Sequence, residues 1–264
     1  PQHVKQGKIT LPLLDAMGIR HEILSQDETE FRSQLDGAVR HMSETGEAFA
    51  FIVRKNTFEP YTLQRHEVNE YPLSREEAIQ KVAASLSAKD VIVSTTGMIS
   101  RELFEYRTAQ GQGHERDFLT VGSMGHASQI ALGIALEKTD RRVWCFDGDG
   151  AALMHLGSVA IIADKAPENF VHVIFNNGAH DSVGGQPTVG LKVNLAGIAK
   201  AAGYKDAVSV TTAEDLGSAL KVLKTMRGPV LLEVRVHRGN RKDLGRPTTT
   251  PIQNRDALME FMGQ

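Results

Sequence analysis

The sequence predicts an α/β protein built on a doubly wound, mainly parallel sheet. Short apolar segments, each about as long as a buried strand, alternate with longer segments of helical periodicity along the chain. Several of the apolar segments are followed directly by glycine and small polar residues, as at the carboxyl ends of parallel strands. With 264 residues and 41% hydrophobic content, the chain is long enough for one large α/β domain, or one domain and part of another.

The first part of the chain, residues 1–58, is expected to be an incomplete α/β domain. Its expected elements are helices at 6–17 and 27–45 and strands at 20–24 and 48–53. The second helix opens at Asp27 with Glu30 three residues later, which is the pattern of a capping box. Two such helix–strand units are few for a domain, so we expect this part to be a piece of a larger one.

A full doubly wound domain is expected over residues 74–264, after a linker at 59–73 that has no helical or strand period. Ser74, with Glu77 three residues later, marks the start of its first helix. The expected strands lie at 90–94, 118–122, 142–147, 170–175, 207–210 and 229–236, and the expected helices at 74–87, 100–108, 124–137, 152–164, 194–202, 213–226 and 254–262.

Composition and charge exclude several classes of protein. A formal net charge of −2 gives no global attraction to nucleic acid. The single cysteine, Cys145, rules out an internal disulfide and a cluster held by four thiolates, and its apolar strand predicts a buried, inert thiol. No segment approaches the roughly 18 apolar residues of a membrane helix, and no signal peptide is apparent. We therefore expect a protein of the reducing cytoplasm.

Two polar turns of the second domain predict a shared ligand site. Gly-Asp-Gly at 148–150 follows the strand at 142–147, and Asn-Asn-Gly at 176–178 follows the strand at 170–175. A crossover helix joins these strands, and ligands of open α/β sheets bind at such carboxyl ends. The carboxylate of Asp149 and an asparagine oxygen suit a hard divalent ion that carries a diphosphate. Either motif alone would be interpreted as a common tight turn, whereas the pair at this spacing favours a cofactor.

This pair of motifs resembles that of thiamine-diphosphate enzymes. The resemblance implies that Asp149, Asn177 and the carbonyl of Ala179 bind Mg²⁺, with the diphosphate of the cofactor completing an octahedron. Asn176 remains the alternative ligand, because the resemblance fixes the presence of an asparagine more firmly than its position. The residues expected to bind the cofactor are Thr96, Gly97, Gly122, Ser123, Met124, Gly148, Asp149, Gly150, Ala151 and Asn177.

The segment Gly-Ser-Met-Gly-His-Ala at 122–127 resembles the loop of thiamine-diphosphate decarboxylases that holds the aminopyrimidine ring. The resemblance implies that Met124 separates the two rings of the cofactor and enforces its bent conformation, and that the carbonyl of Gly122 accepts from the 4′-amino group. Taken alone, the segment would be interpreted as a core methionine beside a close-packed glycine turn.

Two further segments are similar to phosphonopyruvate decarboxylases: NNGAHDSVGGQPT at 176–188 and RKDLGRPTTTP at 241–251. His180 is the candidate acid–base group, since an imidazole exchanges protons near neutral pH. Arginine and lysine of the second segment can donate to phosphonate oxygens, although a solvated basic loop is an equally weighted interpretation. The candidate substrate-binding residues are Ser182, Gln186, Thr188, Arg241, Lys242 and Arg246.

The resemblance implies a carboxy-lyase that converts 3-phosphonopyruvate to phosphonoacetaldehyde and CO₂ in phosphonate biosynthesis. Its class needs a glutamate on a pyrimidine-binding domain, usually that of a neighbouring subunit, and residues 1–58 resemble only the later part of such a domain. We therefore expect the chain to be a C-terminal portion, inactive by itself, of a homo-oligomer of at least two subunits. The expected partner is a small-molecule 2-oxoacid, with neither nucleic acid nor membrane.

Two alternatives stay open. A sulfopyruvate decarboxylase, or a broader 2-oxoacid decarboxylase, would use the same cofactor motif on another substrate. A non-catalytic cofactor-binding subunit would bind thiamine diphosphate and Mg²⁺ without releasing CO₂. A nicotinamide oxidoreductase is disfavoured, because no complete G-x-G-x-x-G motif follows a strand.

Overall fold

The structure is a computed structural model that describes residues 4–61 and 70–263. The chain divides into two compact units, Pro1–Glu67 and Val68–Gln264. The division falls within the linker expected at 59–73, of which residues 62–69 lie outside the described residues. The domain limits 1–58 and 74–264 themselves stay a prediction.

In its described residues, the smaller unit contains two helices and a two-stranded parallel sheet. Its elements are α1 (Val4–Ala16), β1 (Arg20–Ile23), α2 (Glu28–Thr45) and β2 (Phe49–Ile52). The side chain of Asp27 caps α2 by accepting from the N–H of Glu30, but the Glu30 carboxylate accepts from the Ser25 hydroxyl instead of returning to Asp27. The expected capping box is therefore only half formed. Leu24 and Ala38 are the only buried apolar side chains among the described residues of this unit.

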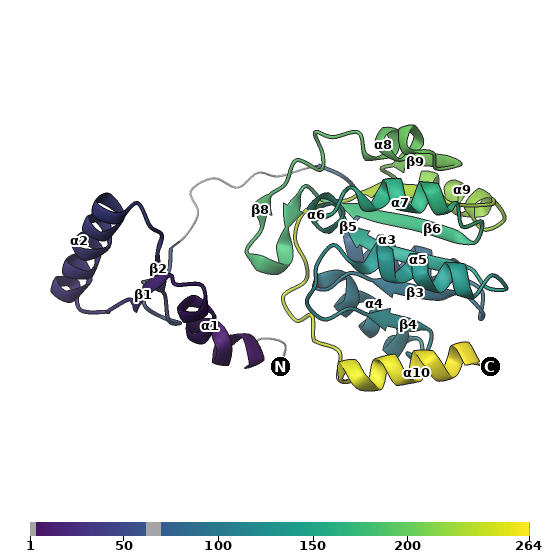
Figure 1. The fold of residues 1–264 in the computed structure, drawn as a ribbon. Coiled ribbons are helices and arrows are strands. Elements are labelled where there is room, and N and C mark those ends of the chain that lie inside the picture. Colours follow the sequence, from purple (N-terminus) through teal and green to yellow (C-terminus); the bar gives the residue numbers. More distant parts are fainter. Residues whose placement is uncertain (1–3, 62–69, 264) are drawn as a thin grey trace. The chain divides into compact units, whose positions relative to one another are not determined.

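The larger unit is built on a six-stranded, entirely parallel sheet, which confirms the predicted fold class (Figure 1). The order across the sheet is β4-β3-β5-β6-β10-β9. Its strands are β3 (Val91–Ser94), β4 (Asp117–Leu119), β5 (Val143–Gly148), β6 (Phe170–Asn176), β9 (Asp206–Val210) and β10 (Val230–Arg235). Their apolar runs are buried on both faces, as expected for a parallel sheet covered by helices.

Helices cover both faces of this sheet (Figure 1). The first face carries α3 (Arg75–Ser85), α4 (Met98–Ala109) and α9 (Ala213–Leu223), and the second carries α5 (Ala127–Glu137), α7 (Ser158–Lys165) and α8 (Leu195–Ala202). A hydrophobic core lies on each face of the sheet, and successive residues of β5 point alternately into the two. Trp144 and Phe146 pack on the first face, and Cys145 packs on the second. Within the described ranges, no helix has the length and apolar character needed to cross a membrane.

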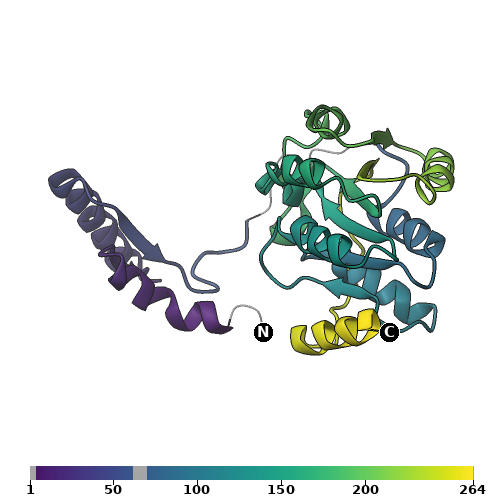
Figure 2. The same cartoon turned by 45° about the vertical axis from the view of Figure 1, so that its right-hand side comes forward.

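The last helix, α10 (Pro251–Gly263), lies beside the edge strand β4 (Figures 1 and 2). The side chain of Asn254 is buried there. Its Oδ1 accepts from the N–H of Leu119 at 2.9 Å, and its Nδ2 donates to the carbonyl of Asp117 at 2.7 Å. One amide side chain therefore pairs with the strand edge as a further strand would, and it covers backbone groups that an edge leaves open.

The helix expected at 152–164 is wrong as a single element. The structure has α6 (Asp149–Met154) and α7, which are separated by residues 155–157. His155 leaves the helical conformation with φ −132° and ψ 49°, and its ring lies 4.3 Å from that of His126. Gly157 lowers helix propensity at this point, so a tertiary contact outweighs the helical period of the sequence.

The helix expected at 124–137 begins later, as α5 at Ala127. Gly122, Ser123 and Gly125 have φ values of 76°, 46° and 90°, which no helix accommodates. The preceding strand β4 ends at Leu119, three residues earlier than expected. Residues 120–126 are therefore a loop shaped by left-handed backbone, with Met124 within it.

Cys145 is buried and free, as the sequence predicts. Burial raises the pKa of its thiol well above the ordinary value, and the charge of Asp147 adds to the effect. His172 lies beside both residues, with its Nε2 3.4 Å from Oδ2 of Asp147. All three side chains are enclosed in the second core, so the thiol is inaccessible.

Candidate cofactor and metal site

A pocket lies at the carboxyl ends of β3, β5 and β6. The chain passes from β3 outward to β4 and then to β5 on the other side of β3, so the winding direction reverses between β3 and β5. Open α/β sheets bind ligands at such a switch point. The pocket encloses about 400 Å³ of empty space, its open mouth included. Ten of the predicted site residues line it: Thr96, Met124, Gly148, Asp149, Gly150, Ala151, Asn177, Ala179, His180 and Ser182.

Asp149 is the first residue of α6 and is only 1% exposed. The hydroxyl of Thr188 donates to its Oδ2, and a Cβ on Gly190 would come within 2.4 Å of the same oxygen. Burial raises the pKa of the Asp149 carboxyl, and the hydrogen bonds from Thr188 and backbone and the nearby His180 ring offset part of this rise. In the described part of the chain, no lysine or arginine pairs with Asp149. Its carboxylate is therefore enclosed without a lysine or arginine partner among the described residues.

The two adjacent asparagines have different surroundings. Asn176 ends β6 and is fully buried; its Nδ2 donates to the carbonyl of Gly190 and to Oε1 of Glu233, and its Oδ1 accepts from Gly178. Both ends of its amide therefore form hydrogen bonds within the protein, to β10 and to the segment that follows β6.

Asn177 instead lines the pocket. Its Nδ2 donates to Oδ2 of Asp181 at 2.7 Å, and its Oδ1 accepts from the N–H of Ala179 at 3.0 Å. Asn176, by contrast, is not among the residues that line the pocket.

A short hairpin, absent from the expected elements, carries the residues after Asn177. It consists of β7 (Ala179–His180), a 3₁₀ turn (Asp181–Val183) and β8 (Gln186–Pro187), and β7 pairs antiparallel with β8. Ala179 and His180 line the pocket, whereas Gln186 is exposed and lies outside its lining. The hairpin thus folds the predicted His180 back over the start of α6.

The loops after β3 and β4 meet at the same edge. Thr96 Oγ1 accepts from the N–H of Gly122 at 3.2 Å, which ties the loop after β4 to the end of β3. Gly97, with φ 107°, packs against Ser182: a Cβ there would lie 3.0 Å from the Ser182 Cβ. Gly97 and Gly122 adjoin the pocket through these contacts, but neither they nor Ser123 line it.

The donor set fits a divalent cation with a diphosphate. The buried Asp149 carboxylate has no lysine or arginine partner in the described ranges, and a buried charge requires a counter-ion, a metal or a bound proton. Asn177 and Ala179, whose side-chain amide and backbone carbonyl carry further oxygen atoms, line the same pocket. Oxygen ligands of this kind suit Mg²⁺, and the small residues Gly148 and Ala151 leave room for a ligand close to the backbone.

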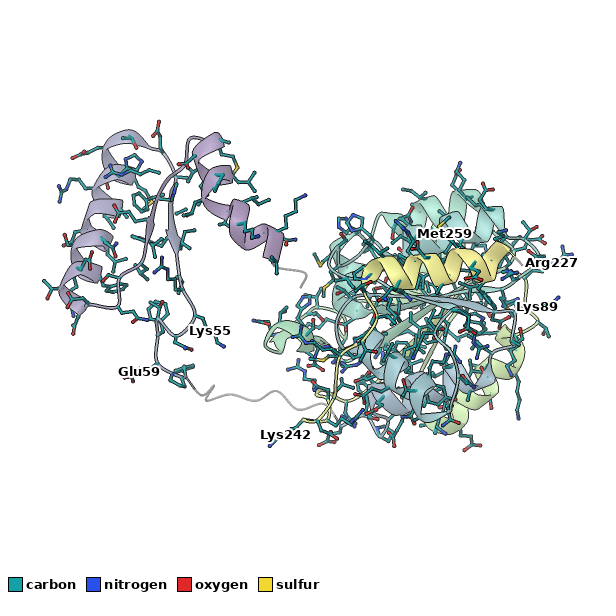
Figure 3. All side chains as sticks on the ribbon, turned by 90° about the horizontal axis from the view of Figure 1, so that it is seen from below. Lys55, Glu59, Lys89, Arg227, Lys242 and Met259 are labelled. Carbon is teal, nitrogen blue, oxygen red and sulfur yellow. The ribbon has the colours of Figure 1, made fainter. Side chains whose placement is uncertain are left out.

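The predicted basic segment lies apart from the pocket lining. The guanidinium of Arg241 forms ion pairs with three carboxylates: Glu76, Glu105 and Asp243. Lys242 and Arg246 are exposed, and Lys242 points away from the surrounding side chains (Figure 3). None of these three cations contributes to the pocket lining, so the structure does not bring them together with Asp149 and Asn177.

Six pocket residues were not predicted from the sequence: Arg75, Thr95, Met98, Ile99, Phe175 and Asp181. Thr95 and Phe175 adjoin predicted positions at the ends of two strands. Their signal is this position, because every residue at a strand end beside the site is a candidate for the pocket lining. Arg75 directly follows the Ser74 cap and gives no further signal, because its partners lie far along the chain. Asp181 lies in the segment 176–188, but its negative charge gives no reason to expect it beside an anionic ligand.

Comparison with known proteins identifies a family whose matched region contains most of the residues that line the pocket. Residues 95–234 match the family model "Thiamine pyrophosphate enzyme, C-terminal TPP binding domain". A phosphonopyruvate decarboxylase of Streptomyces hygroscopicus is 32% identical over 276 aligned positions, which cover 99% of this chain and 67% of that protein. Sulfopyruvate decarboxylase subunit beta of Methanocaldococcus jannaschii is 39% identical over 152 residues, covering 57% of this chain and 77% of the relative.

Among solved structures, benzoylformate decarboxylase of Polynucleobacter necessarius superposes with a TM-score of 0.53 at 17% identity, covering 73% of this chain and 38% of that one. This likeness concerns the fold. The matched family model, the fold and the switch-point pocket together identify the cofactor-binding domain of a thiamine pyrophosphate enzyme. Within that class, the chain belongs to the phosphonopyruvate decarboxylase family, and it spans about two thirds of the length of the relatives it matches there.

Proposed function

We propose that the protein containing this chain is a thiamine-diphosphate- and Mg²⁺-dependent decarboxylase that converts 3-phosphonopyruvate to phosphonoacetaldehyde and CO₂. The observation that carries the proposal is the buried Asp149 carboxylate, set beside Asn177 at the switch point without a lysine or arginine partner among the described residues. Similarity to phosphonopyruvate decarboxylases over nearly the whole chain supports the choice of substrate.

In this proposal Asp149, the side-chain oxygen of Asn177 and the carbonyl of Ala179 hold the metal. Asn176 is the weaker alternative, because its amide is already bonded to Gly190, Glu233 and Gly178. When bound, thiamine diphosphate supplies the electron sink that allows a 2-oxoacid to lose CO₂. Metal binding requires the ionised form of Asp149, so the cation displaces the proton that burial favours.

Other pocket residues are assigned by their position. Met124 lines the pocket from the loop after β4 and would enforce the bent conformation of the cofactor. His180 would hold or move a proton at one of its ring nitrogens, because it is the histidine that lines the pocket. Ser182 lines the pocket beside Gly97 and is the candidate for contact with the substrate.

Thr188 is reassigned from substrate contact to support of the metal ligand. Its hydroxyl donates to Asp149 and accepts from the N–H of Gly190 at 3.0 Å, so both of its roles are filled inside the protein. The candidates Gln186, Arg241, Lys242 and Arg246 lie outside the pocket lining, and contact of these residues with the phosphonate stays a prediction.

The complete activity is proposed for the whole protein, as a homo-oligomer in which a neighbouring subunit supplies the pyrimidine-binding domain and its glutamate. The name of the similar M. jannaschii protein, a subunit, supports assembly of this kind of site from more than one chain. The inactivity of these 264 residues by themselves and the cytoplasmic location stay predictions.

Sulfopyruvate is the second candidate substrate. The 39% identity with a sulfopyruvate decarboxylase subunit over 152 residues favours it, and this stretch is more similar than the phosphonopyruvate decarboxylases are over the whole chain. A sulfonate carries about one negative charge less than a phosphonate, so the two acids differ in charge at similar size.

The test is CO₂ release by the full-length protein with thiamine diphosphate and Mg²⁺, comparing phosphonopyruvate, sulfopyruvate and pyruvate. We expect the highest kcat/KM for phosphonopyruvate, and loss of release when a chelator removes the metal. Preference for sulfopyruvate would replace the substrate and keep the cofactor assignment. Binding of the cofactor without CO₂ release from any acid would support a non-catalytic subunit, and Asp149→Ala serves as the control for metal-dependent binding.

A further inference from the structure

The carboxylate of Asp181, which lines the pocket, accepts hydrogen bonds from three separate segments of the chain. Its Oδ2 accepts from Nη1 of Arg75 at 2.9 Å, from Nδ2 of Asn177 at 2.7 Å and from the N–H of Gly239 at 3.0 Å. Asp181 follows the hairpin strand β7, Arg75 begins α3, and Gly239 lies after β10. One carboxylate oxygen therefore joins three parts of the chain at the candidate metal site.

Arg75 is itself held rigidly. Its Nε and Nη2 donate to the two carboxylate oxygens of Glu102 on α4, at 2.9 and 2.8 Å. Arg75 and Glu102 are 4% and 1% exposed. Burial lowers the pKa of Arg75, but the hydrogen bonds and charges of Glu102 and Asp181 outweigh it and raise the value. A bidentate pair in this setting fixes the direction of the third nitrogen, Nη1, toward Asp181.

This arrangement determines which end of the Asn177 amide faces which way. An amide has a donor end and an acceptor end, and Oδ2 of Asp181 acts as an acceptor for each of its partners. Nδ2 must therefore face Asp181, and the oxygen end is left to accept from Ala179. A rotation of the amide by half a turn would set two oxygens against each other and lose both hydrogen bonds.

We propose that Arg75 and Asp181 are positioning residues for the metal site, which orient the Asn177 amide so that its oxygen is available as a ligand. The inference rests on the proposed function, because it takes Asn177 as a ligand of the divalent ion. Neither residue needs to touch the metal. Residues that orient metal ligands in this way affect metal affinity by about 10- to 100-fold.

The substitutions Asp181→Asn and Arg75→Lys test the orientation. Asparagine at position 181 keeps the side-chain shape, but it can face Asn177 with either its amide oxygen or its amide nitrogen, so it no longer fixes the orientation of the Asn177 amide. Lysine at position 75 keeps the positive charge but loses the bidentate pair with Glu102. The probe is Mn²⁺ in the presence of thiamine diphosphate, with binding to the full-length protein followed by electron paramagnetic resonance. We expect the Kd for Mn²⁺ to rise about 10- to 100-fold in both variants, and kcat to recover at saturating Mg²⁺.

Arg75→Gln distinguishes an effect of Arg75 on the orientation of Asp181 and Asn177 from an effect of its positive charge on the bound cation. If only the local potential mattered, removing a positive charge beside the site would tighten Mn²⁺ binding. If Arg75 acts by holding Asp181, the same substitution weakens it. Arg107→Lys is the matched control, because Arg107 forms a similar bidentate buried pair with Asp117 at 2.8 and 3.0 Å but lies outside the pocket lining.

Thermal unfolding and circular dichroism establish that each variant is folded, and Asp181→Asn decides the question if a variant at position 75 does not fold. Unchanged Mn²⁺ affinity in a folded Asp181→Asn protein, or tighter binding in Arg75→Gln, would overturn the inference and leave the proposed function intact. Absence of Mn²⁺ and cofactor binding in the unsubstituted protein would overturn both. A weakening in Arg107→Lys equal to that in Arg75→Lys would also count against a positioning role.

Discussion

The imidazole ring of His180 lies directly against the backbone of Gly150. A Cβ built on Gly150 would come within 2.4 Å of Cε1 and 2.5 Å of Nδ1 of that ring. Gly150 belongs to α6 with ordinary helical backbone, so its glycine is required by space and not by conformation. The Gly-Asp-Gly segment thus provides the carboxylate of Asp149 and, at Gly150, the space against which the ring of His180 packs.

Gly150→Ala should therefore displace His180 from the pocket. Overpacking of this kind costs about 1–3 kcal/mol. We expect weaker cofactor binding or a lower kcat, by about tenfold or more. Titration of the full-length protein with thiamine diphosphate and steady-state kinetics measure the two effects.

Gly133→Ala is the control for that substitution. Gly133 also lies in a helix, α5, but has no atom within 4 Å of its hypothetical Cβ. Alanine there should leave activity unchanged and stabilise the protein by up to about 1 kcal/mol through helix propensity. An equal loss of activity in both variants would contradict the role given to the His180 contact.

Asp149→Asn should stabilise the ligand-free protein while abolishing metal-dependent cofactor binding. Asparagine removes the buried charge and can still accept from Thr188 through its Oδ1. We expect a gain of about 0.5–2 kcal/mol in the free energy of unfolding at neutral pH. Denaturant unfolding without ligand, together with Mn²⁺ binding, measures both consequences. A destabilised variant that still binds metal would remove Asp149 from the site.

Metal binding should weaken as pH falls through the raised pKa of Asp149. Burial is the main cause of that rise, and the proton competes with the cation for the same oxygens. Because the folded pKa lies above the unfolded one, the native state binds more protons between the two values. Stability of the ligand-free protein should therefore fall as pH rises through this window. Mn²⁺ titrations and thermal unfolding across pH, with Asp149→Asn as reference, check the two opposite trends.

Structural features that depend only on residues close together in the sequence could be predicted. Five strands of the parallel sheet agree with the expected ranges to within one residue, whereas β4 ends early, and the Ser74–Glu77 capping box is present as predicted. The start of α10 also carries a local signal: Thr250 and Gln253 cap each other's backbone, with Pro251 at the first helical position. That pattern explains why α10 begins three residues before the helix expected at 254–262.

Features that depend on tertiary partners could not be predicted. Arg75 meets Glu102 and Asp181 only in the folded chain, at sequence separations of 27 and 106 residues. The break between α6 and α7 follows from the contact of His155 with His126, which no helical period reveals. The pocket could therefore be inferred from the strand ends, whereas the residues that orient its ligands required the structure.

Asn254→Ala should destabilise the larger unit at the edge of its sheet. The substitution removes the acceptor for the N–H of Leu119 and the donor to the carbonyl of Asp117, at a side chain that is 4% exposed. Loss of hydrogen bonds that leaves buried backbone groups unsatisfied costs about 1–3 kcal/mol. Met259→Ala on the same helix is the control, because Met259 is 61% exposed and its loss should stay within about 0.5 kcal/mol (Figure 3). Equal unfolding free energies for the two variants would show that α10 is held by apolar contacts, and that the amide of Asn254 does not contribute to holding the edge strand.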